Sequence, residues 1–559
     1  MSTIESLSFS DIFVGGDLSQ RIERNFDRLE SSIYRSPDIF KPNDGEWPGD
    51  YEGRTILALV LLAQASHRPP LYLSEIMRHL ADHVNPQGYF GSIRTMGSVD
   101  EQQLAGNSWV LRAMVEHYRW KHDSLSRQII QTIVENLLVP IGGLFSVYPS
   151  DERPMIEGGP AGQLLDQHRG AWSLSTDIGC AFIMLDGATA AYSILPSPRL
   201  KRVIEEMVRR FAELDPQVLS MQTHATLSAA RGITRYYEID GNASLLSVVE
   251  RTYQLYTRNA MTANYANYNW FGRPRWTEAC AVIDSFILAT ELWKHTRRAQ
   301  YLDDAHKIYF NAMCHAQRPN GGFGCDSCVG APGNNLEPLS SAAFEASWCC
   351  TMRGGEGLAR AAQYIWLVEA DKIILGFYHN GIARILMGAD HITIRQVTRY
   401  PVQGAIRLEI LDTSVVEDTT LSLYIPEWVD NHQVCLTIHG VRQTAQVTDH
   451  FVAVTKRFQP GDIVELAFPI PLRRVESVAN SENSYSLWHG TLMLGAESRS
   501  QEVTLSPSET FTPLENAFYR MKESHRLLSP LTDLYLTTTE TAVTDRRQVL
   551  FPSTEMHSR

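Results

Sequence analysis

The stretch Arg54-Thr-Ile-Leu-Ala-Leu-Val-Leu-Leu-Ala-Gln64 is apolar on almost every side, and Asp177-Ile-Gly-Cys-Ala-Phe-Ile-Met-Leu185 has the same character further along the chain. A helix that is hydrophobic all round is usually buried in a large protein. Two other stretches, Leu200–Leu214 and Leu245–Tyr256, place their charges on one side at helical spacing, as outer helices do. The sequence therefore predicts buried helices that tend to alternate with amphipathic ones.

Twelve segments in the first two-thirds of the chain have apolar residues at helical spacing. They lie near residues 20–33, 54–66, 72–84, 107–121, 126–137, 177–193, 197–213, 223–238, 243–258, 280–295, 299–316 and 354–368. Short turns, such as the one at Asp240-Gly241-Asn242, join consecutive segments. We therefore expect six helical hairpins that close into an (α/α)6 toroid over residues 1–370. An open helical solenoid is the alternative, although solenoid repeats keep a stricter period.

The long connections at one end of such a toroid would build its binding site, because function concentrates on loops held by a rigid scaffold. Four links are long and rich in glycine and aromatic residues, at 85–105, 140–175, 259–277 and 317–350. We expect these links to form the walls of the site.

After about residue 370 the hydrophobic pattern changes to a period of two, which is typical of half-buried strands. Examples are Ile392–Val397, Ile406–Ile410, Thr420–Ile425 and Val464–Phe468. The sequence thus predicts a multidomain protein in which an α region precedes a β region. The toroid is followed by a β-sandwich region over residues 371–559, with a strand-rich C-terminal extension from about residue 505.

Composition narrows the class of protein. The net charge of -13, with no basic run, disfavours binding to nucleic acid or to an anionic membrane. The first residues lack the basic start and apolar run of a secretory signal, and no stretch approaches the about 20 apolar residues of a membrane span. The 8 cysteines are too sparse for a disulfide scaffold in a chain of 559 residues. We therefore expect a cytoplasmic protein with reduced thiols.

One carboxylate and three thiols form a candidate metal site, namely Glu278, Cys280 and the adjacent pair Cys349 and Cys350. Carboxylate oxygen and thiolate sulfur are suitable ligands for tetrahedral Zn²⁺. The spacing is not that of a zinc finger, so the fold must bring the two segments together. The spacing alone leaves open that Cys280 is an ordinary buried thiol and that Cys349-Cys350 is a small apolar pair.

A second cysteine motif, Cys325-Asp-Ser-Cys328, competes with this set. The spacing of its cysteines is found in metal knuckles and redox sites. No second motif of this kind accompanies it in the chain. The pair is therefore either a rival for the metal or a neighbour of the site.

Motifs around these residues extend into the C-terminal half. They are Thr277-Glu-Ala-Cys280, Trp348-Cys-Cys350, Gly357-Leu-Ala-Arg360, Gln363-Tyr-Ile365, Leu423–Trp428, Pro460–Leu466, Pro469–Arg474 and His489–Leu492. In residue type and order they resemble the β-L-arabinofuranosidases of glycoside hydrolase family 127. The likeness covers most of residues 50–500 at the level of motifs.

The resemblance implies a retaining glycosidase with a cysteine nucleophile. Carried over position by position, Glu278, Cys280, Cys349 and Cys350 bind Zn²⁺, and Cys349 attacks the anomeric carbon. Zinc can hold a thiol as a thiolate below its free pKa of about 8.5. Water must later hydrolyse the glycosyl-thioether with the help of a base.

A retaining glycosidase also needs a general acid, which this family carries as a Glu in the loop before its Glu-x-Cys motif. Here no Asp or Glu occurs from Arg251 to Thr277. The candidates for the missing acid are Glu337, Glu345 and Asp326 on the loop that carries the other ligands, and Tyr265 or Tyr268. A tyrosine would need its pKa of about 10 to be tuned. Otherwise the protein performs different chemistry or none.

Several residues are candidates for binding the sugar. His224 matches a family His that faces the sugar, whereas Asn107 replaces another family His. Tyr265 and Tyr268 are either sugar-stacking aromatics or core residues. Asp177 heads an apolar helix, where it is either a carboxylate of the site or an N-cap. These differences indicate that the residues expected to bind sugar depart from the family pattern, while the four expected metal ligands are kept.

The leading hypothesis is a zinc-dependent retaining glycoside hydrolase that acts on a small glycoside or oligosaccharide, β-L-arabinofuranoside-like or related. The alternatives are a lyase or isomerase on a modified sugar and a non-catalytic sugar-binding protein with structural zinc. The expected partner is a small carbohydrate, with no nucleic acid and no membrane. A homodimer remains open.

Overall fold

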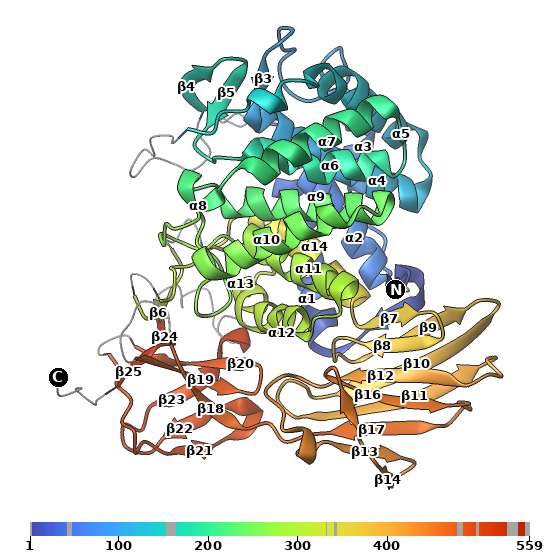
Figure 1. Cartoon of the computed structure of the whole chain (residues 1–559), viewed down its shortest axis with the longest axis vertical. Coiled ribbons are helices and arrows are strands. Elements are labelled where there is room, and N and C mark those ends of the chain that lie inside the picture. The colour runs from blue at the N-terminus through green and yellow to red at the C-terminus, as the bar shows by residue number, and fades with distance from the viewer. Residues whose placement is uncertain are drawn as a thin grey trace.

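The computed structural model describes residues 3–41, 47–151, 164–330, 333–339, 344–477, 484–498, 502–533 and 546–553, and for residues 164–167 the backbone alone. Within these residues six helices form a closed ring. The helices lie above the strands of the C-terminal half in Figure 1. Each packs against the next, and the last packs against the first. In ring order they are α2 (Asp50–Ser66), α4 (Glu101–Lys121), α6 (Met184–Tyr192), α9 (Thr223–Asp240), α11 (Ala279–Thr296) and α14 (Cys350–Gln363).

A second set of helices packs on the outside of this ring. They are α1 (Gly16–Leu29), α3 (Leu73–Leu80), α5 (Ser124–Ile133), α7 (Pro198–Glu213), α10 (Ala243–Asn259) and α12 (Ala299–Ile308). The predicted (α/α)6 toroid is thereby confirmed, and each of the twelve predicted segments contains one of these helices or overlaps it. Parts of the expected walls at 140–175 and 317–350 lie outside the described residues.

Glycines allow neighbouring inner helices to approach closely. A Cβ atom at Gly187 on α6 would lie 2.7 Å from the main-chain oxygen of Ser108 on α4. A Cβ at Gly232 on α9 would lie 2.4 Å from the carbonyl carbon of Leu185 on α6. Side chains at these two positions would push the helices apart, so glycine is required for the ring to close.

The predicted β-sandwich follows the ring, and two strands from the N-terminus complete it. One sheet has the order β1-β7-β8-β12-β16-β15 and the other β14-β13-β17-β11-β10-β9-β2. The strands are β1 (Glu5–Ser6), β2 (Ile12–Val14), β7 (Trp366–Glu369), β8 (Lys372–Leu375), β9 (Gly381–Met387), β10 (Asp390–Thr398), β11 (Ala405–Thr413), β12 (Thr419–Tyr424), β13 (Cys435–Ile438), β14 (Val441–Gln443), β15 (Val447–Thr448), β16 (Phe451–Lys456) and β17 (Ile463–Ala467). The sandwich therefore begins at β7, a few residues before the expected boundary at 370.

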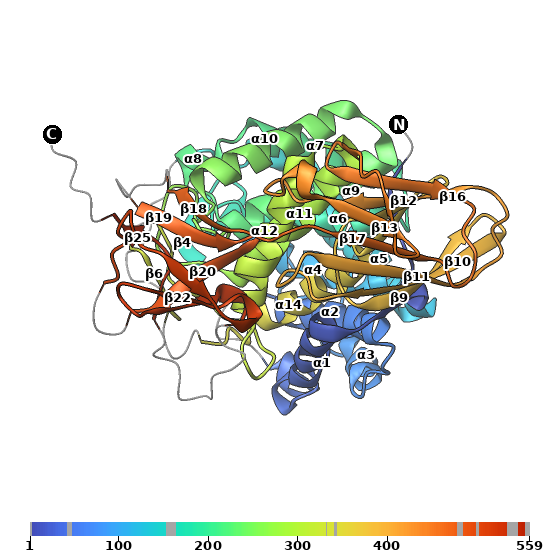
Figure 2. The same cartoon turned by 90° about the horizontal axis from the view of Figure 1, so that it is seen from below.

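A third sheet lies beside the sandwich, under the helices (Figures 1 and 2). Its strands are β18 (Leu472–Glu476), β19 (Ser484–His489), β20 (Leu492–Glu497), β21 (Phe511–Pro513), β22 (Tyr519–Met521), β23 (Leu527–Pro530), β24 (Arg547–Gln548), β25 (Phe551–Pro552) and, from the helical region, β6 (Asn335–Leu336). The expected boundary at about 505 thus falls inside a sheet that already starts at β18. Residues 534–545 and 554–559 of the expected extension lie outside the described residues.

A short three-stranded sheet stands near the ring, formed by β3 (Val99–Asp100), β4 (Leu164–Arg169) and β5 (Trp172–Ser175). It leads the chain into α6. Among the described helices, none combines the length and the apolar character that a bilayer crossing requires.

Buried charges fill the inside of the ring. Asp284 on α11 accepts hydrogen bonds from Arg231 on α9, at 2.6 Å, and from Arg353 on α14, at 2.5 Å. Glu356 on α14 accepts from Arg231 at 2.6 Å and from Arg112 on α4 at 3.1 Å. All five side chains are at most 3% exposed. Ion pairs therefore connect four of the six inner helices, α4, α9, α11 and α14.

The network continues to α6. Asp186 lies 3.1 Å from Arg112 and 2.7 Å from Arg235 on α9. Burial acts to raise the pKa of Asp186, but Arg235 and Arg112 outweigh it and hold that pKa well below its usual range. The carboxylate therefore stays ionised. Because removing one partner of a buried ion pair leaves an uncompensated charge, each of these residues is needed by the others.

Substituting one carboxylate of the network should destabilise the ring. We expect Glu356→Gln to lower the free energy of unfolding by about 3–5 kcal/mol, because Arg112, Arg231 and also Arg353 pair with this carboxylate and would lose a counter-charge. The measurement is denaturant unfolding followed by circular dichroism. The control is Glu409→Gln, which breaks an exposed pair with Arg395 on the sandwich and should cost at most about 1 kcal/mol. Equal losses in the two variants would contradict the role given to the network.

Candidate metal centre

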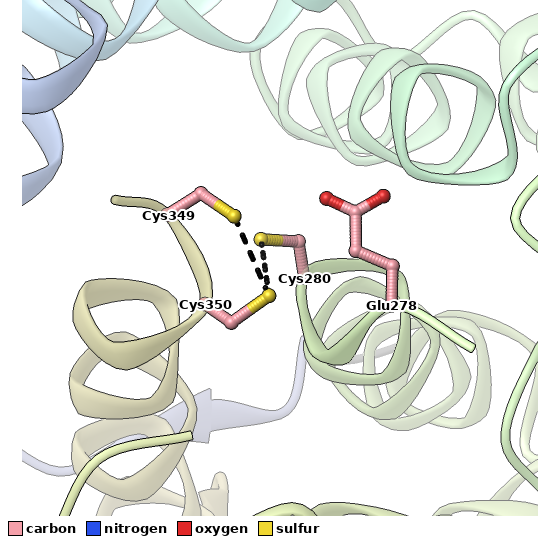
Figure 3. Close-up of side chains that lie close together, drawn as sticks. All are labelled: Glu278, Cys280, Cys349 and Cys350. Atoms are coloured by element: carbon pink, nitrogen blue, oxygen red, sulfur yellow. Dashed lines mark hydrogen bonds between the residues drawn. The ribbon is translucent and has the colours of Figure 1, made fainter. Parts of the chain in front are cut away.

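The four candidate ligands stand at the starts of two neighbouring inner helices. Glu278 is the residue before α11, and Cys280 lies in its first turn. Cys349 is the residue before α14, and Cys350 is the first residue of that helix. Because α11 and α14 pack against each other in the ring, their N-terminal ends bring the four side chains together (Figure 3).

The distances fit a tetrahedral metal site. One donor atom from each of the four residues lies within 4.8 Å of all the others. The sulfur of Cys350 lies 3.7 Å from that of Cys280 and 3.4 Å from that of Cys349. With Zn–S bonds of about 2.3 Å, two sulfurs of a tetrahedral site lie about 3.8 Å apart. All three thiols are free of disulfides.

The electrostatics of this cluster also favour a cation. Burial, together with the neighbouring Cys280 and Asp177, raises the pKa of Glu278 well above its ordinary value. Burial raises the pKa of Cys280 to about 11. Oε2 of Glu278 is buried and has no hydrogen-bond partner among the described residues. Without a cation the ligands hold their protons, so this donor set fits a divalent metal ion that supplies the missing positive charge.

Arg54 on α2 connects the cluster to the charges inside the ring. Its Nη1 donates to Sγ of Cys280 at 3.5 Å, and its Nε lies 2.8 Å from Oδ2 of Asp50. Its Nη2 lies 3.2 Å from Nε2 of His224, whose Nδ1 lies 2.5 Å from Oδ2 of Asp284. The ligands and the ion-pair network are thus joined through one arginine and one histidine.

His224 is held in place from three sides. Both of its ring nitrogens have partners, and its ring stacks on Trp109 of α4 with centroids 5.7 Å apart. The guanidinium of Arg54 lies 4.3 Å from the centre of the same Trp109 ring. Sequence reasoning found His224 but missed Arg54, Asp284 and Trp109. The available signal was a charged residue inside each of two otherwise apolar helices.

Two family models match the chain over the helices that carry this cluster and over the sandwich. Residues 213–363 match the β-L-arabinofuranosidase, GH127 catalytic domain, and residues 372–470 match the β-L-arabinofuranosidase, GH127 middle domain. Over these two regions the chain is similar to glycoside hydrolase family 127. The predicted resemblance is confirmed, and the protein is a glycosidase.

Solved structures agree with this family at the level of the fold. A GH127 β-arabinofuranosidase superposes with a TM-score of 0.74 at 14% sequence identity, covering 98% of each chain. A GH127 β-L-arabinofuranosidase from Geobacillus stearothermophilus T6 gives a TM-score of 0.66 at 14% identity, covering 96% of this chain and 94% of the other. Identities this low show the shared fold alone. No curated protein sequence matches the chain.

The two cysteines of the competing motif, Cys325 and Cys328, lie in different environments. Sγ of Cys325 lies 3.9 Å from Sγ of Cys350, at the edge of the cluster. Sγ of Cys328 instead donates to the main-chain oxygen of Asn267 at 3.8 Å. Among the described residues, neither belongs to the four whose donor atoms meet. Cys325 is thus a neighbour of the site, and the two cysteines do not act together as a ligand pair.

Asn107 does not have the role expected for it. Its Oδ1 accepts a hydrogen bond from the main-chain N–H of Phe90 at 2.9 Å. Its Nδ2 donates to the carbonyl oxygens of Phe90 at 3.1 Å and Gln103 at 2.9 Å. The amide therefore fixes the 85–105 link on α4. This corrects the expectation that Asn107 binds sugar.

Neither of the two candidate tyrosines is suited to act as the general acid. Tyr265 packs on Trp488 of the third sheet, with ring centroids 6.0 Å apart, and on Nζ of Lys307, 5.3 Å from its ring centre. It therefore lies between the helices and that sheet, which corrects its expected place in the sugar site. Burial raises the pKa of Tyr265, and burial together with Cys328 raises that of Tyr268. Neither hydroxyl is tuned toward neutral pH.

The carboxyls considered as acids on the ligand loop already have hydrogen-bond or ion-pair partners. Oε1 of Glu345 accepts from Nε of Arg28 at 2.8 Å, and its Oε2 accepts from Asn320 at 2.6 Å. Asp326 pairs with Arg318 at 2.9 Å. Glu337 is about half exposed, at 47%, and lies 3.8 Å from Arg546 on the C-terminal side. These contacts correct the expectation that Glu345 protonates a leaving group, whereas the role expected for Glu337 stays a prediction.

Asp177 is the remaining candidate, and it is not an N-cap. Its side chain caps no helix, and the nearby 3-10 turn (Cys180–Ile183) is preceded by Gly179. The side chain is buried, and its Oδ1 has no hydrogen-bond partner among the described residues. Burial, together with Glu101, raises the pKa of Asp177 to about 7. Asp177 is therefore not a capping group, and its place in the sugar site stays a prediction.

Removing a ligand should remove the metal. We expect the purified enzyme to bind about one equivalent of zinc, and Cys280→Ala to lose it, because the site would keep only three of the four donors that a closed site uses. Elemental analysis after dialysis measures the metal content. The control is Cys435→Ala, a half-buried thiol on β13 outside the cluster. Full zinc retention in Cys280→Ala would contradict the assignment.

Zinc affinity should depend steeply on pH. Because the pKa of Cys280 is raised to about 11, its thiol is protonated in the metal-free protein and must release a proton on binding. In the metal-free protein, the stability contributed by this neutral thiol is complete below the usual pKa of about 8.5 and is lost as pH rises through the raised value. Competition with a chelator from about pH 6 to about pH 9 should show affinity rising about tenfold per pH unit for each released proton. A pH-independent affinity would contradict this account.

Proposed function

We propose that this glycosidase is a zinc-dependent retaining enzyme in which Cys349 is the nucleophile. The observation that supports the proposal is the meeting of Glu278, Cys280, Cys349 and Cys350 at the starts of α11 and α14. Three sulfurs and one carboxylate oxygen match the ligands that zinc prefers. The alternative of a non-catalytic protein with structural zinc does not explain why Cys349 is only partly buried while Cys280 and Cys350 are fully buried.

Cys349 is the thiol best placed to attack a substrate. Cys280 and Cys350 are 0% exposed, whereas Cys349 is only partly buried. Cys349 also stands just before α14, where the helix N-terminus stabilises negative charge. In the metal-free protein Cys280, Cys350 and burial raise the pKa of the Cys349 thiol well above its ordinary value, so a cation is needed to ionise it.

When bound, zinc would keep the thiol of Cys349 ionised below its ordinary pKa. Sγ of Cys349 then attacks the anomeric carbon, and the bond from that carbon to the leaving oxygen breaks as the oxygen takes a proton from a general acid. Water next attacks the same carbon and gives up a proton to the base, and the carbon–sulfur bond breaks. Two displacements at one carbon retain its configuration.

The substrate class follows from the polar groups beside the ligands. Gln222 and Asn269 are buried, and Oε1 of Gln222 and both amide atoms of Asn269 lack partners among the described residues. Such groups are costly to bury unless something else binds them, and sugar hydroxyls can both donate and accept. We infer a small glycoside or oligosaccharide as the substrate, β-L-arabinofuranoside-like or a related sugar.

Replacing the nucleophile should abolish turnover. We expect Cys349→Ala to hydrolyse nitrophenyl arabinofuranosides or a related nitrophenyl glycoside at least about 1,000-fold more slowly, since the covalent route is closed. Release of nitrophenol measures the rate, and NMR of the first-formed sugar reports its anomeric configuration.

The matched control is Cys435→Ala, which should keep the wild-type rate because its half-buried thiol lies on β13. A retained configuration together with a covalent sugar adduct at Cys349 supports the proposal. An inverted product, a product with a new double bond, or undiminished activity in Cys349→Ala would rule it out.

A further inference from the structure

The reaction proposed for this enzyme needs a carboxyl that gives a proton to the leaving oxygen and later takes one from water. The loop before Glu278 carries no Asp or Glu from Arg251 to Thr277. The group must therefore come from another part of the ring.

Most buried carboxylates near the cluster are already neutralised by arginine. Asp50 pairs with Arg54, and Asp326 pairs with Arg318. Asp284 and Glu356 belong to the ion-pair network inside the ring. At Asp326 and Asp284 the neighbouring arginines outweigh burial and lower the pKa, so these two groups are poor proton donors. At Asp50 burial outweighs Arg54 and raises the pKa, but Arg54 remains the partner of that carboxyl.

Asp177 differs from all of these. It is 4% exposed, and no arginine or lysine is paired with it among the described residues. Its main-chain N–H donates to Oγ of Ser175 at 3.2 Å, whereas its Oδ1 has no partner in the described part of the chain. Oδ1 of Asp50 also lacks a hydrogen-bond partner among the described residues, but Asp50 is paired with Arg54, so Asp177 is distinguished by having no cationic partner there. A buried carboxyl oxygen without a partner requires an explanation, such as a bound water, ion or ligand or a chemical role.

Main-chain hydrogen bonds place Asp177 on the wall that also carries Glu278. The N–H of Gln222 donates to the oxygen of Ile178 at 2.9 Å. The N–H of Thr223 donates to the oxygen of Asn269, and the N–H of Asn269 donates to the oxygen of Trp276, both at 2.9 Å. The segments that begin the third, fourth and fifth inner helices are therefore joined in order.

This wall carries several polar side chains that lack partners. Asp177, Gln222, Asn269 and Glu278 stand along it, each within two residues of one of these bonds. Each has at least one buried polar atom without a partner among the described residues. The charge of Asp177 acts on Glu278 and raises its pKa, so the two carboxyls are close enough to interact. Asp177 therefore shares a polar wall with a ligand of the metal and with the amides proposed to bind sugar.

We propose that Asp177 is the general acid and base of this enzyme, in place of a carboxyl on the 259–277 loop. The proposal rests on the function proposed above. In the first step the carboxyl of Asp177 gives its proton to the leaving oxygen as the bond from the anomeric carbon to that oxygen breaks. In the second step the resulting carboxylate takes a proton from the water that attacks the same carbon, and Sγ of Cys349 leaves as a thiolate.

The protonation state of Asp177 agrees with this role. Burial, followed by the charge of Glu101, raises its pKa to about 7. Near that pH the group is present in both forms, so it can give and take a proton with little cost. Glu101 itself is held by Oη of Tyr148 at 2.5 Å and by the N–H of Ser175 at 2.7 Å, so it is positioned to maintain this effect.

Glu52 on α2 is the principal rival. Burial raises its pKa to about 7 as well, but main-chain N–H groups of Glu52 and Gly49 hydrogen bond to its carboxyl. Its charge is also not among the causes that raise the pKa of Glu278. A comparison of Asp177 with Glu52 therefore tests the assignment directly.

The experiment compares Asp177→Asn with Glu52→Gln and with Glu337→Gln, each a carboxyl-to-amide change. Each variant is assayed with the nitrophenyl glycoside and the methyl glycoside of the same sugar. We expect Asp177→Asn to lose about 100-fold or more on the methyl glycoside and much less in the first step on the nitrophenyl glycoside, because nitrophenolate leaves without a proton. Intact mass should then show the sugar accumulating on Cys349, and added azide should restore turnover and form a glycosyl azide.

Glu52→Gln and Glu337→Gln should keep the wild-type ratio of the two rates and show no azide rescue. The assignment would be overturned if Asp177→Asn lost activity equally on the two substrates and showed neither a sugar adduct nor azide rescue. It would also be overturned if Glu52→Gln showed the selective loss on the methyl glycoside, the adduct and the rescue that are expected of Asp177→Asn. Should Asp177→Asn lose its fold or its zinc, Asp177→Glu takes its place, and it must keep a pH–rate profile with two limbs at a reduced rate. If the wild-type enzyme never forms a sugar adduct at Cys349, the proposed function fails. If the wild-type enzyme forms the adduct but Asp177→Asn keeps the wild-type rates on both substrates, only this inference fails.

Discussion

The hydrogen bonds of Arg54 join the candidate metal centre to the ion-pair network inside the ring. On one side its guanidinium contacts the sulfur of Cys280, and on the other it contacts His224, which is bound to Asp284. Asp284 in turn pairs with arginines from two further inner helices. A buried ion network of this kind is stable only when every charge is compensated, so it requires the six helices to take one arrangement. The position of the cysteines is a consequence of that arrangement.

The same constraint explains why reactive groups collect at one end of the ring. Helices α11 and α14 begin with the ligands, so their N-terminal ends place three sulfurs and a carboxyl around one point (Figure 3). Because these groups are acidic and buried together, they repel one another when ionised. A cation would satisfy the four donors at once, and Cys349 is the one of the three cysteines that is only partly buried. Buried acidic groups thus account both for the arrangement of the inner helices and for the reactivity proposed for Cys349.

Local patterns in the sequence predict the helices and strands well, since burial on one or all sides is a property of a short segment. The ligands also follow from the motifs. The roles of Asn107 and Tyr265 do not, because each is determined by contacts with a distant segment, at Phe90 and Trp488. The partners of Arg54 are equally hidden, since an arginine in an apolar helix does not reveal which charges it meets. The unpaired state of Asp177 depends on three loops that only the fold brings together.

The claim on which this account most depends is that three sulfurs and one oxygen surround a single zinc ion. X-ray absorption at the zinc edge of the purified enzyme measures this shell directly. The account predicts three Zn–S distances of about 2.3 Å and one Zn–O distance of about 2.0–2.2 Å. A shell of nitrogen and oxygen alone, or one with a single sulfur, would contradict it.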